Sequence, residues 1–300
     1  MKILITGSNG LLGQKLVDLL RKQPDIEVIA TARNANRLPA LWDGYTFSKM
    51  DITISDQVNE VVQQHQPEVI INTAAMTQVD DCELNKEECW KQNVTSVEYL
   101  IHAARDVNAR LVHVSTDFIF DGSDGPLDES AIPNPVNYYG ESKLAAEGLV
   151  RQSELSWAIV RTVLVYGITS DMTRSNIVLW VKKSLEDGKL IRVVNDQWRT
   201  PTLAEDLAMG CYLVSKSKAE GIYHISGEGM LTPYDIAQAT ADVFGLDKTL
   251  IEETDASQFS QPAKRPPKTG FVIEKARKEL GYTPHSFKGG LKILKDQMVE

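Results

Sequence analysis

The order of strand-like and helix-like segments limits this chain to few folds. Runs that are apolar at nearly every position are typical of strands covered on both faces, and they alternate here with segments of helical periodicity. The expected strands are Lys2–Thr6, Glu27–Thr31, Glu68–Asn72, Arg110–Val114 and Trp157–Arg161, with helices over Leu11–Arg21, Ser55–Gln64, Lys86–Arg105 and Tyr139–Gln152. Such alternation implies right-handed crossovers. We therefore expect an α/β fold with a Rossmann-type doubly wound parallel sheet.

The second half of the chain is less regular and predicts a smaller α/β substrate domain. Helices are expected over Asn176–Leu185, Leu203–Val214, Pro233–Phe244, Ile273–Leu280 and Phe287–Gln297, and strands over Leu190–Val194 and Gly221–Ile225. Glu252–Thr269 holds three prolines and few apolar residues, so we expect a loop there. The working division is a dinucleotide-binding domain, 1–165, and a mainly substrate-binding domain, 166–300. Segments around 203–225 are expected to return to the first domain.

Composition excludes several classes of function. The net charge of −9 and the lack of a Lys/Arg run argue against a nucleic-acid surface. No uncharged apolar run approaches the length that crosses a bilayer, so no membrane partner is expected. Cys82, Cys89 and Cys211 lack the spacing of a metal site, and their odd number favours reduced thiols in a cytoplasmic protein without a metal.

Three glycines lie between the first strand and the first helix. The segment is Gly7-Ser8-Asn9-Gly10-Leu11-Leu12-Gly13. Gly7 permits a tight turn, Gly10 lets the backbone approach a pyrophosphate, and Gly13 lets the helix pack closely on the sheet. The amides at the helix N-terminus then receive the diphosphate. An ordinary glycine turn is the alternative, but the strand–turn–helix context favours a dinucleotide site.

The segment after the second strand bears on the choice of cofactor. An NAD site usually places Asp or Glu there, whereas this chain has Arg33, with Arg37 nearby. A cation favours the 2′-phosphate of NADP(H) over NAD(H), and solvated surface arginines are the alternative. Asp51 and Ile52, after the third strand region, either flank an adenine or, in the case of Asp51, cap a helix.

Small residues end the strand that closes at Asn72. Asn72-Thr73-Ala74-Ala75 would let the cofactor lie across the carboxyl edge of the sheet, where open α/β sheets bind ligands. A plain tight turn is the competing interpretation. Asn93, inside a long predicted helix, either bridges to Lys143 through water or is an ordinary polar helix position.

A tyrosine and a lysine four residues apart supply the candidate chemistry. Tyr139 and Lys143 face the same side of a predicted helix, and an ammonium beside a phenol lowers a pKa that starts near ~10. The phenol can then exchange a proton with a carbonyl or alcohol. We expect Tyr139 to be the general acid, Lys143 also to bond the nicotinamide ribose, and Thr116 to orient the carbonyl oxygen. Tyr138 is not equivalent, because Ser142 lies four residues beyond it.

The order of these motifs carries more weight than any one of them. A bare Tyr-x-x-x-Lys is common by chance and fits a surface helix equally well. Here it follows the glycine loop, the Asn72 turn and Thr116, so together they predict a nicotinamide-dependent oxidoreductase whose cofactor supplies the hydride. The histidines form no motif and are expected to be structural or exposed; they are His65, His102, His113, His224 and His285.

These motifs resemble the extended short-chain dehydrogenase/reductase superfamily, and more closely the dTDP-4-dehydrorhamnose reductase family. The matching segments are Gly7–Gly13, Asn72–Asp80, Val114–Gly122, Pro133–Leu144, Arg161–Gly167, Val194–Thr202, Asp206–Ala208 and Arg265-Pro266. The resemblance therefore runs through nearly the whole chain. Val114–Gly122 is specific to the reductase branch, whereas the glycine loop and the Tyr/Lys pair specify only the superfamily.

The resemblance implies NADPH-dependent reduction of the 4-keto group of a nucleotide-linked 6-deoxysugar, as in dTDP-rhamnose biosynthesis, and a homodimer is an expected assembly. Thr116, Tyr139 and Lys143 carry over as catalytic residues. The expected substrate contacts are Thr77, Val79, Asp117, Phe118, Gln197 and Trp198. Asp117 assists either the substrate or a neighbouring loop, and Gln197 lies either in the substrate cleft or in a turn.

Two departures leave the exact substrate open. The family often has Tyr at the position of Phe118, and often Asn soon after Arg-Pro, where this chain has Pro267-Lys268. Two other functions stay in view. An epimerase or dehydratase of the superfamily retains its nicotinamide, but a dehydratase would favour Glu at the position of Phe118. A regulatory subunit of methionine adenosyltransferase belongs to the family resembled, although the complete Thr/Tyr/Lys group argues against lost catalysis.

Overall fold

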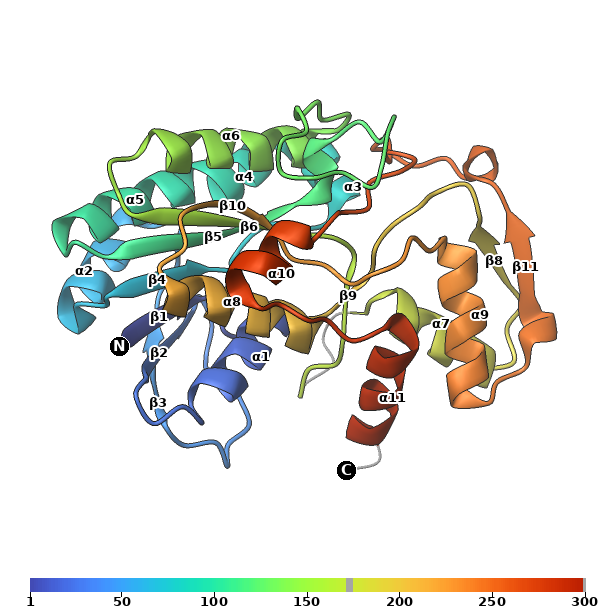
Figure 1. The fold of residues 1–300 in the computed structure, drawn as a ribbon, viewed down its shortest axis with the longest axis horizontal. Coiled ribbons are helices and arrows are strands. Elements are labelled where there is room, and N and C mark those ends of the chain that lie inside the picture. The colour runs from blue at the N-terminus through green and yellow to red at the C-terminus, as the bar shows by residue number, and fades with distance from the viewer. Residues whose placement is uncertain (171–174, 299–300) are drawn as a thin grey trace.

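A parallel sheet of seven strands forms the centre of the larger lobe (Figure 1). The computed structural model describes residues 1–170 and 175–298. The strand order is β10-β6-β5-β4-β1-β2-β3, and all neighbours are parallel. The strands are β1 (Lys2–Thr6), β2 (Glu27–Ala32), β3 (Tyr45–Lys49), β4 (Val69–Asn72), β5 (Arg110–Thr116), β6 (Trp157–Thr162) and β10 (Gly221–His224). This order confirms the Rossmann-type doubly wound sheet expected from the sequence.

Helices cover both faces of this sheet. One face packs against α1 (Leu11–Leu20), α8 (Ala204–Ser217) and α10 (Glu274–Leu280); the other packs against α2 (Ser55–His65), α5 (Ser96–Asp106) and α6 (Tyr138–Gln152). The strands are buried on both sides, which explains why their sequences are apolar at successive positions rather than alternating.

The smaller lobe lies beside the carboxyl edge of the sheet (Figure 1). It contains a two-stranded parallel sheet, β8 (Ile191–Val194) and β11 (Ile251–Thr254), with α7 (Ile177–Glu186), α9 (Pro233–Phe244) and α11 (Phe287–Gln297). A further short pair, β7 (Val165–Tyr166) and β9 (Thr202–Leu203), lies where the chain passes between the lobes. The small lobe has its own apolar clusters, so it is a packed unit and not a set of loops.

Several elements differ from the sequence-based expectation, among them the short strands β7 and β9, which were not expected. β11 takes up the first three residues of the stretch Glu252–Thr269 that was expected to be a loop. It forms because Ile251 is buried and the strand pairs in parallel with β8, while the three prolines all follow it. The short helix α3 (Val79–Leu84) was not expected. The predicted helix Lys86–Arg105 is present as α4 (Lys86–Trp90), a π-helical turn (Lys91–Thr95) and α5 in unbroken succession.

The segment around 203–225 joins the large lobe. β10 pairs with β6 at the edge of the central sheet, and α8 packs beside α1. A domain boundary at residue 165 stays a prediction.

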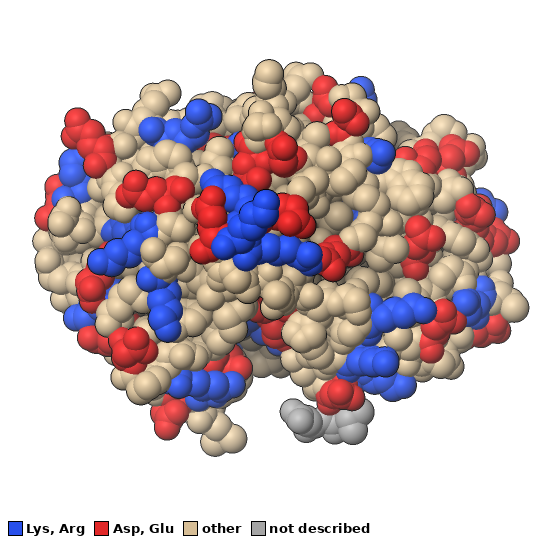
Figure 2. Space-filling view, in the orientation of Figure 1, with Lys and Arg blue, Asp and Glu red and all other residues tan. Residues whose placement is uncertain are grey.

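Charged side chains of both signs are interspersed over the face seen in Figure 2, which offers no broad single-sign surface. Among the described residues, no helix is both long enough and apolar enough to pass through a bilayer.

Candidate active site

The site lies where the strand order reverses. β1 pairs with β2 on one side and with β4 on the other, so the chain leaves these strands in opposite directions across the sheet. The carboxyl ends of β1, β4 and β5 carry the glycine loop, Asn72 and Thr116. Such a reversal opens a crevice in doubly wound sheets, and ligands bind there.

The glycine loop has the geometry of a phosphate-binding turn. Gly7 has a φ of +67°, which L side chains rarely adopt, and a Cβ on Gly13 would lie 2.3 Å from the Gly7 carbonyl oxygen. Gly10 is the N-cap of α1 and supplies no side chain to the first-turn amides. The amides of Leu11 and Leu12 therefore lie in the unpaired first turn of a helix, as a pyrophosphate site requires.

Asn9 ties this loop to the segment after β2. Its Nδ2 donates to the Ala35 carbonyl at 2.8 Å, and its Oδ1 accepts from the Arg37 amide at 3.0 Å. Arg33 and Arg37 have exposed side chains on this segment. The bonds of Asn9 thus keep the segment that carries Arg33 and Arg37 close to the glycine loop. Both polar atoms of the Asn9 side chain are used in these bonds.

Asp51 and Ile52 have local roles. The Asp51 carboxylate accepts from the amide and hydroxyl of Thr53 at 2.9 and 2.8 Å, which stabilises the turn before α2 rather than capping the helix. Ile52 packs against the core under α2 and α5.

The Asn72 side chain points into the protein. It is buried, accepts from the Thr6 hydroxyl at 2.6 Å and lies 3.1 Å from His113 Nδ1. The Thr73 hydroxyl donates to the Thr6 carbonyl at 2.6 Å, while Ala74 and Ala75 are half-buried. The expected contact of this turn with a cofactor therefore falls to its backbone and small side chains, because the Asn72 amide is already satisfied.

Tyr139 of α6 lies beside the end of β5, where its ring packs on Phe118. Burial raises the pKa of Tyr139 above its usual value, although the nearby Thr116 hydroxyl acts to lower it. Thr116 also accepts from the Phe118 amide at 3.2 Å. One hydroxyl at the end of β5 and one phenol of α6 thus face the same point.

Lys143 has other partners than those expected. Its Nζ donates to the Val114 carbonyl at 2.7 Å and lies 3.1 Å from His113 Nε2. Burial lowers the pKa of Lys143 to about 8. The prediction that Lys143 lowers the pKa of Tyr139 is not met in this arrangement, because desolvation dominates that phenol and the amine bonds β5 instead.

Asn93 joins two segments near the site through direct hydrogen bonds. It lies in the π-helical turn, and its amide bonds both backbone groups of Met76 and the Ser142 hydroxyl, all within 3.0 Å. It therefore fastens the segment after β4 to helix α6. Inserted π-helical turns often occur at functional sites.

Asp117 belongs to a buried polar cluster between the lobes, formed with Thr116, Thr269 and Arg199. Its carboxylate accepts from the hydroxyls of Thr116 and Thr269 and lies 3.8 Å from the Arg199 guanidinium. Burial raises the pKa of Asp117, and the same desolvation lowers the pKa of Arg199. Of the two roles expected for Asp117, the contact with a neighbouring loop is the one present.

The other expected substrate contacts lie beside Tyr139, on the surface or in a cavity of the small lobe. Phe118 packs edge-on against Tyr139, with ring centroids 6.0 Å apart. Val79 packs beside Tyr139 against Cys82 and Cys89. Thr77 is exposed, and Trp198 is 40% exposed while its backbone pairs with the segment around Thr269. Gln197 lines a cavity in the small lobe.

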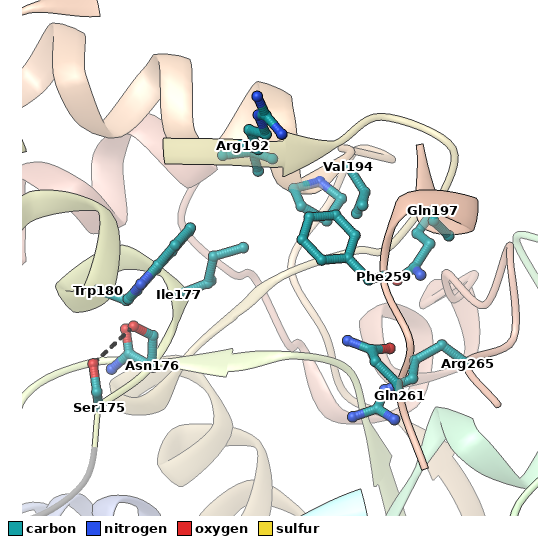
Figure 3. Close-up of a pocket in the computed structure, with 13 residues that line it drawn as sticks. Ser175, Asn176, Ile177, Trp180, Arg192, Val194, Gln197, Phe259, Gln261 and Arg265 are labelled. Carbon is teal, nitrogen blue, oxygen red and sulfur yellow. Dashed lines mark hydrogen bonds between the residues drawn. The ribbon is translucent and has the colours of Figure 1, made fainter. Parts of the chain in front are cut away.

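This cavity, of about 500 Å³, lies among the elements of the small lobe (Figure 3). Figure 3 shows Trp180, Ile177 and Phe259 around a common space, with Gln261 and Arg265 at its lower edge. The remaining lining comes from the segment before α7, β8 and the turn after it, the start of α9 and the turn after β11; the residues are Ser175, Asn176, Arg192, Val193, Val194, Gln197, Pro233 and Ala256. Flat apolar groups beside two arginines suit a base and a diphosphate.

Arg265 is positioned across the lobes. Its guanidinium pairs with the carboxylate of Asp80, with Nη2 and Oδ2 2.7 Å apart, and this bond lowers the pKa of Asp80. Asp80 stands at the start of α3 in the large lobe. The pair therefore connects the cavity to the helix that flanks Tyr139.

Sequence reasoning missed His113, Arg199 and most of the cavity. His113 lies in β5 with no distinguishing motif, and Arg199 and Arg265 acquire meaning only through partners far away in the chain. The sequence did hold two signals for the pair of Asp80 and Arg265, because both residues lie in segments that match the resembled family.

Comparisons with known proteins agree with this geometry. The family model described as "RmlD substrate binding domain" matches residues 1–299. The chain is 31% identical to a dTDP-4-dehydrorhamnose reductase of Aggregatibacter actinomycetemcomitans, over 98% of each chain. It is 32% identical to methionine adenosyltransferase 2 subunit beta of Xenopus laevis, over 82% of this chain and 72% of that one.

Solved structures give the same result. A dTDP-4-dehydrorhamnose reductase from Clostridium acetobutylicum has a TM-score of 0.88, at 32% identity and full coverage of both chains. One from Bacillus anthracis, in complex with NADP, has a TM-score of 0.86, at 28% identity over 99% of each chain. By its sequence over almost its entire length, the chain belongs to the family of the RmlD substrate binding domain.

Proposed function

We propose that the protein is an NADPH-dependent reductase of the 4-keto group of a nucleotide-linked deoxysugar. The reaction class, a nicotinamide-dependent oxidoreductase, is that of its reductase relatives. The observation that carries the proposal is the placement of Thr116 and Tyr139 close together at the carboxyl edge of the sheet that also bears the glycine loop.

The residues present fit a dinucleotide. Gly13 leaves no room for a Cβ, Gly10 leaves the first-turn amides of α1 uncapped, and Arg33 and Arg37 follow β2. These cations suit a 2′-phosphate, and a relative of known structure was solved in complex with NADP. When bound, NADPH supplies the hydride.

The chain's own residues handle the oxygen of the keto group. Tyr139 delivers its proton to this oxygen as negative charge develops there. The Thr116 hydroxyl, which donates to Asp117 in this structure, would turn to the same oxygen when the substrate binds. A buried phenol with a raised pKa keeps its proton at neutral pH, as a general acid in the reduction must. Asp117 accepts a hydrogen bond from Thr116 and is itself paired with Arg199, so these two residues hold Thr116 in place.

The cavity of the small lobe is proposed as the nucleotide site. Trp180 and Phe259 offer faces to a base, and Arg192 and Arg265 offer charge to a diphosphate. Phe118 packs on Tyr139, and Gln197 lines the cavity itself. A homodimer and a cytoplasmic location are part of the same proposal.

The test is a panel of nucleotide-linked 4-keto sugars assayed by consumption of NADPH and of NADH. We expect turnover with at least one dTDP-linked 4-keto-6-deoxysugar and a preference for NADPH. Purified protein that carries tightly retained oxidised NAD and turns over without added cofactor would indicate an epimerase or dehydratase instead.

The likeness to methionine adenosyltransferase 2 subunit beta supports a second candidate, a regulatory subunit without turnover. The outcome that favours it is co-purification with another enzyme, combined with no NADPH oxidation on any keto sugar of the panel.

A further inference from the structure

Two buried cysteines lie beside Tyr139, and the reduction described above uses neither of them. Cys82 of α3 and Cys89 of α4 form one cluster with the Tyr139 ring, and both are free thiols. Each thiol is the largest influence on the pKa of the other, which places the two sulfur atoms close together. The third cysteine, Cys211, packs on the opposite face of the central sheet.

A break between two short helices brings the pair together. In one straight helix a separation of seven residues spans about 10 Å along the axis, whereas a disulfide joins Cα atoms at most about 7 Å apart. Here α3 ends at Leu84 and α4 begins at Lys86. Asn85 between them has a φ of −128° and a ψ of 62°, which are not helical. This break allows Cys82 and Cys89 to reach the same cluster.

Cys89 is the thiol with polar neighbours. Its Sγ accepts from Asn93 Nδ2 at 3.4 Å and lies 3.5 Å from the Ser142 hydroxyl oxygen. The Cys82 thiol, these two polar groups and the positive charge of Lys143 together outweigh burial, and lower the pKa of Cys89 to about 7. Cys89 is therefore partly a thiolate near neutral pH, and the thiolate is the form that reacts with oxidants.

The other two cysteines are held as thiols. The Sγ of Cys82 donates to the Met76 carbonyl at 3.6 Å, and the neighbouring Cys89 together with burial raises the pKa of Cys82. Burial raises the pKa of Cys211 to about 12. The cluster beside Tyr139 thus combines one nucleophilic thiol with one protonated thiol, as redox-sensing pairs do.

The cover over this pair is thin. Helices α3 and α4 contain six and five residues, and neither begins with a side-chain cap. Residues 84–88 are exposed, and the Met76 and Val79 side chains that pack on the pair are half-buried. Short surface segments with few buried contacts open locally at low free-energy cost. A molecule as small as hydrogen peroxide can therefore reach Cys89.

We propose that Cys82 and Cys89 are a reversible modification site, at which hydrogen peroxide forms an intrachain disulfide that slows the enzyme. The bond itself does not depend on the proposed reductase function, whereas its effect on turnover rests on that function.

The reaction has two steps. The Cys89 thiolate attacks one oxygen of the peroxide: an S–O bond forms, the O–O bond breaks, and the leaving hydroxide takes up a proton to become water. The Cys82 sulfur then attacks the sulfenic acid: the S–S bond forms, the S–O bond breaks, and the hydroxyl leaves as water with the Cys82 proton. The two thiols lose two electrons in all, and one peroxide is reduced to two waters.

Both helices carry connections of the site. Asp80, two residues before Cys82, pairs with Arg265 at the cavity of the small lobe. The chain after Cys89 continues into the π-helical turn, where Asn93 bonds helix α6. A covalent bond draws α3 and α4 together and so displaces both connections. Small displacements of reacting groups lower turnover strongly.

The first test maps the thiols of the full chain after treatment with hydrogen peroxide, by mass spectrometry of tryptic peptides prepared without reduction. Trypsin cuts after Lys86, so Cys82 and Cys89 fall in separate peptides that only the bond holds together. We expect the linked pair, its loss on treatment with dithiothreitol, and a free Cys211. Two free thiols, or a bond from either to Cys211 or to a second chain, overturn the proposal.

The second test concerns the order of the two steps. In Cys82→Ser the sulfenic acid of Cys89 has no thiol to attack it, so we expect dimedone to label Cys89 after treatment with peroxide. In Cys89→Ser we expect no label on Cys82, because this thiol keeps its proton. Labelling of Cys82 but not of Cys89 overturns the assignment of Cys89 as the attacking group.

The third test measures turnover of a keto sugar before peroxide, after peroxide and after dithiothreitol. We expect wild-type turnover to fall at least about tenfold and then to recover. Cys89→Ser should keep its turnover in peroxide, whereas the matched control Cys211→Ser should lose it as the wild type does. Dithiothreitol does not reverse oxidation of Met76, so recovery assigns the loss to the thiols. Full turnover of a protein that carries the bond overturns its effect on the enzyme.

The two proposals fail differently. A linked peptide in a protein that reduces no keto sugar refutes the reductase and keeps the modification site. Reduction that persists in peroxide, with both thiols free, keeps the reductase and refutes the site. If a serine variant does not fold, the peptide map of the wild-type protein still decides.

Discussion

The two sides of the active crevice are built on different principles. On the large-lobe side the polar groups are buried and bonded to one another, as in the hydrogen bonds that run from Thr6 to Lys143 and in those of Asn93. On the small-lobe side Trp180, Phe259 and Arg192 surround an open cavity. The first arrangement holds reacting groups still; the second presents a surface to a ligand. In the proposed function, chemistry and recognition therefore belong to different lobes.

The largest expected effect tests the large-lobe side. Tyr139→Phe removes the proton donor and should lower kcat about 10³-fold, because general acids contribute 10²–10⁴-fold, while NADPH binding is retained. Turnover is measured on a keto sugar and binding by fluorescence of NADPH. Tyr138→Phe is the control and should keep its turnover. A Tyr139→Phe variant with most of its activity would remove this tyrosine from the mechanism.

The second effect is on stability and pH. The ordinary pKa of lysine is 10.5 and that of Lys143 is lowered to about 8, so between these values the unfolded chain binds more protons than the folded protein. Stability should therefore rise with pH in this window, by at most about 3 kcal/mol, and Lys143→Met should abolish that rise. Urea unfolding at pH 7.5 and pH 10 measures it. Lys292→Met, at an exposed position, should keep the wild-type difference.

The third effect concerns the glycine loop. In Gly13→Ala the new methyl group would meet the Gly7 carbonyl oxygen at 2.3 Å, so the backbone must move. We expect the Kd for NADPH to rise at least about tenfold, by titration calorimetry. Gly148→Ala is the control, since its Cβ would meet nothing within 4 Å and alanine favours a helix. Equal affinity in the two variants would show that the loop does not contact the cofactor.

The smallest effect tests the small lobe. Arg265→Gln removes a cavity cation and should raise KM for the nucleotide sugar about tenfold, with kcat changed less than about threefold. Asp80→Asn leaves the arginine in place but unpaired, and should raise KM less. Arg105→Gln on α5 serves as the control for lost charge. A fall in kcat with constant KM would show that the small lobe also takes part in catalysis, and would contradict the division of roles between the lobes.

The same division explains what the sequence could predict. The glycine loop, Thr116, Tyr139 and Lys143 are recognisable because local spacing and strand ends place them. The partner of Lys143 could not be predicted, since it depends on how α6 packs on β5.

Distance along the chain limits prediction in the small lobe. Asp80 and Arg265 meet although 185 positions separate them, and no periodicity indicates such a contact. β11 was missed for a related reason: two of its residues are glutamates, and its partner β8 alone makes it a strand.

The late return of β10 has a consequence for synthesis. β6 ends at Thr162, and its outer neighbour begins only at Gly221, about 60 residues later. At the ~5–20 residues per second of a ribosome, the backbone groups on that side of β6 wait roughly 3 to 12 seconds for their partners. An apolar strand with an open edge invites pairing with other chains during that interval. Chaperones that shield nascent chains should therefore matter most after the catalytic helix has emerged and before the last strand of the sheet is made.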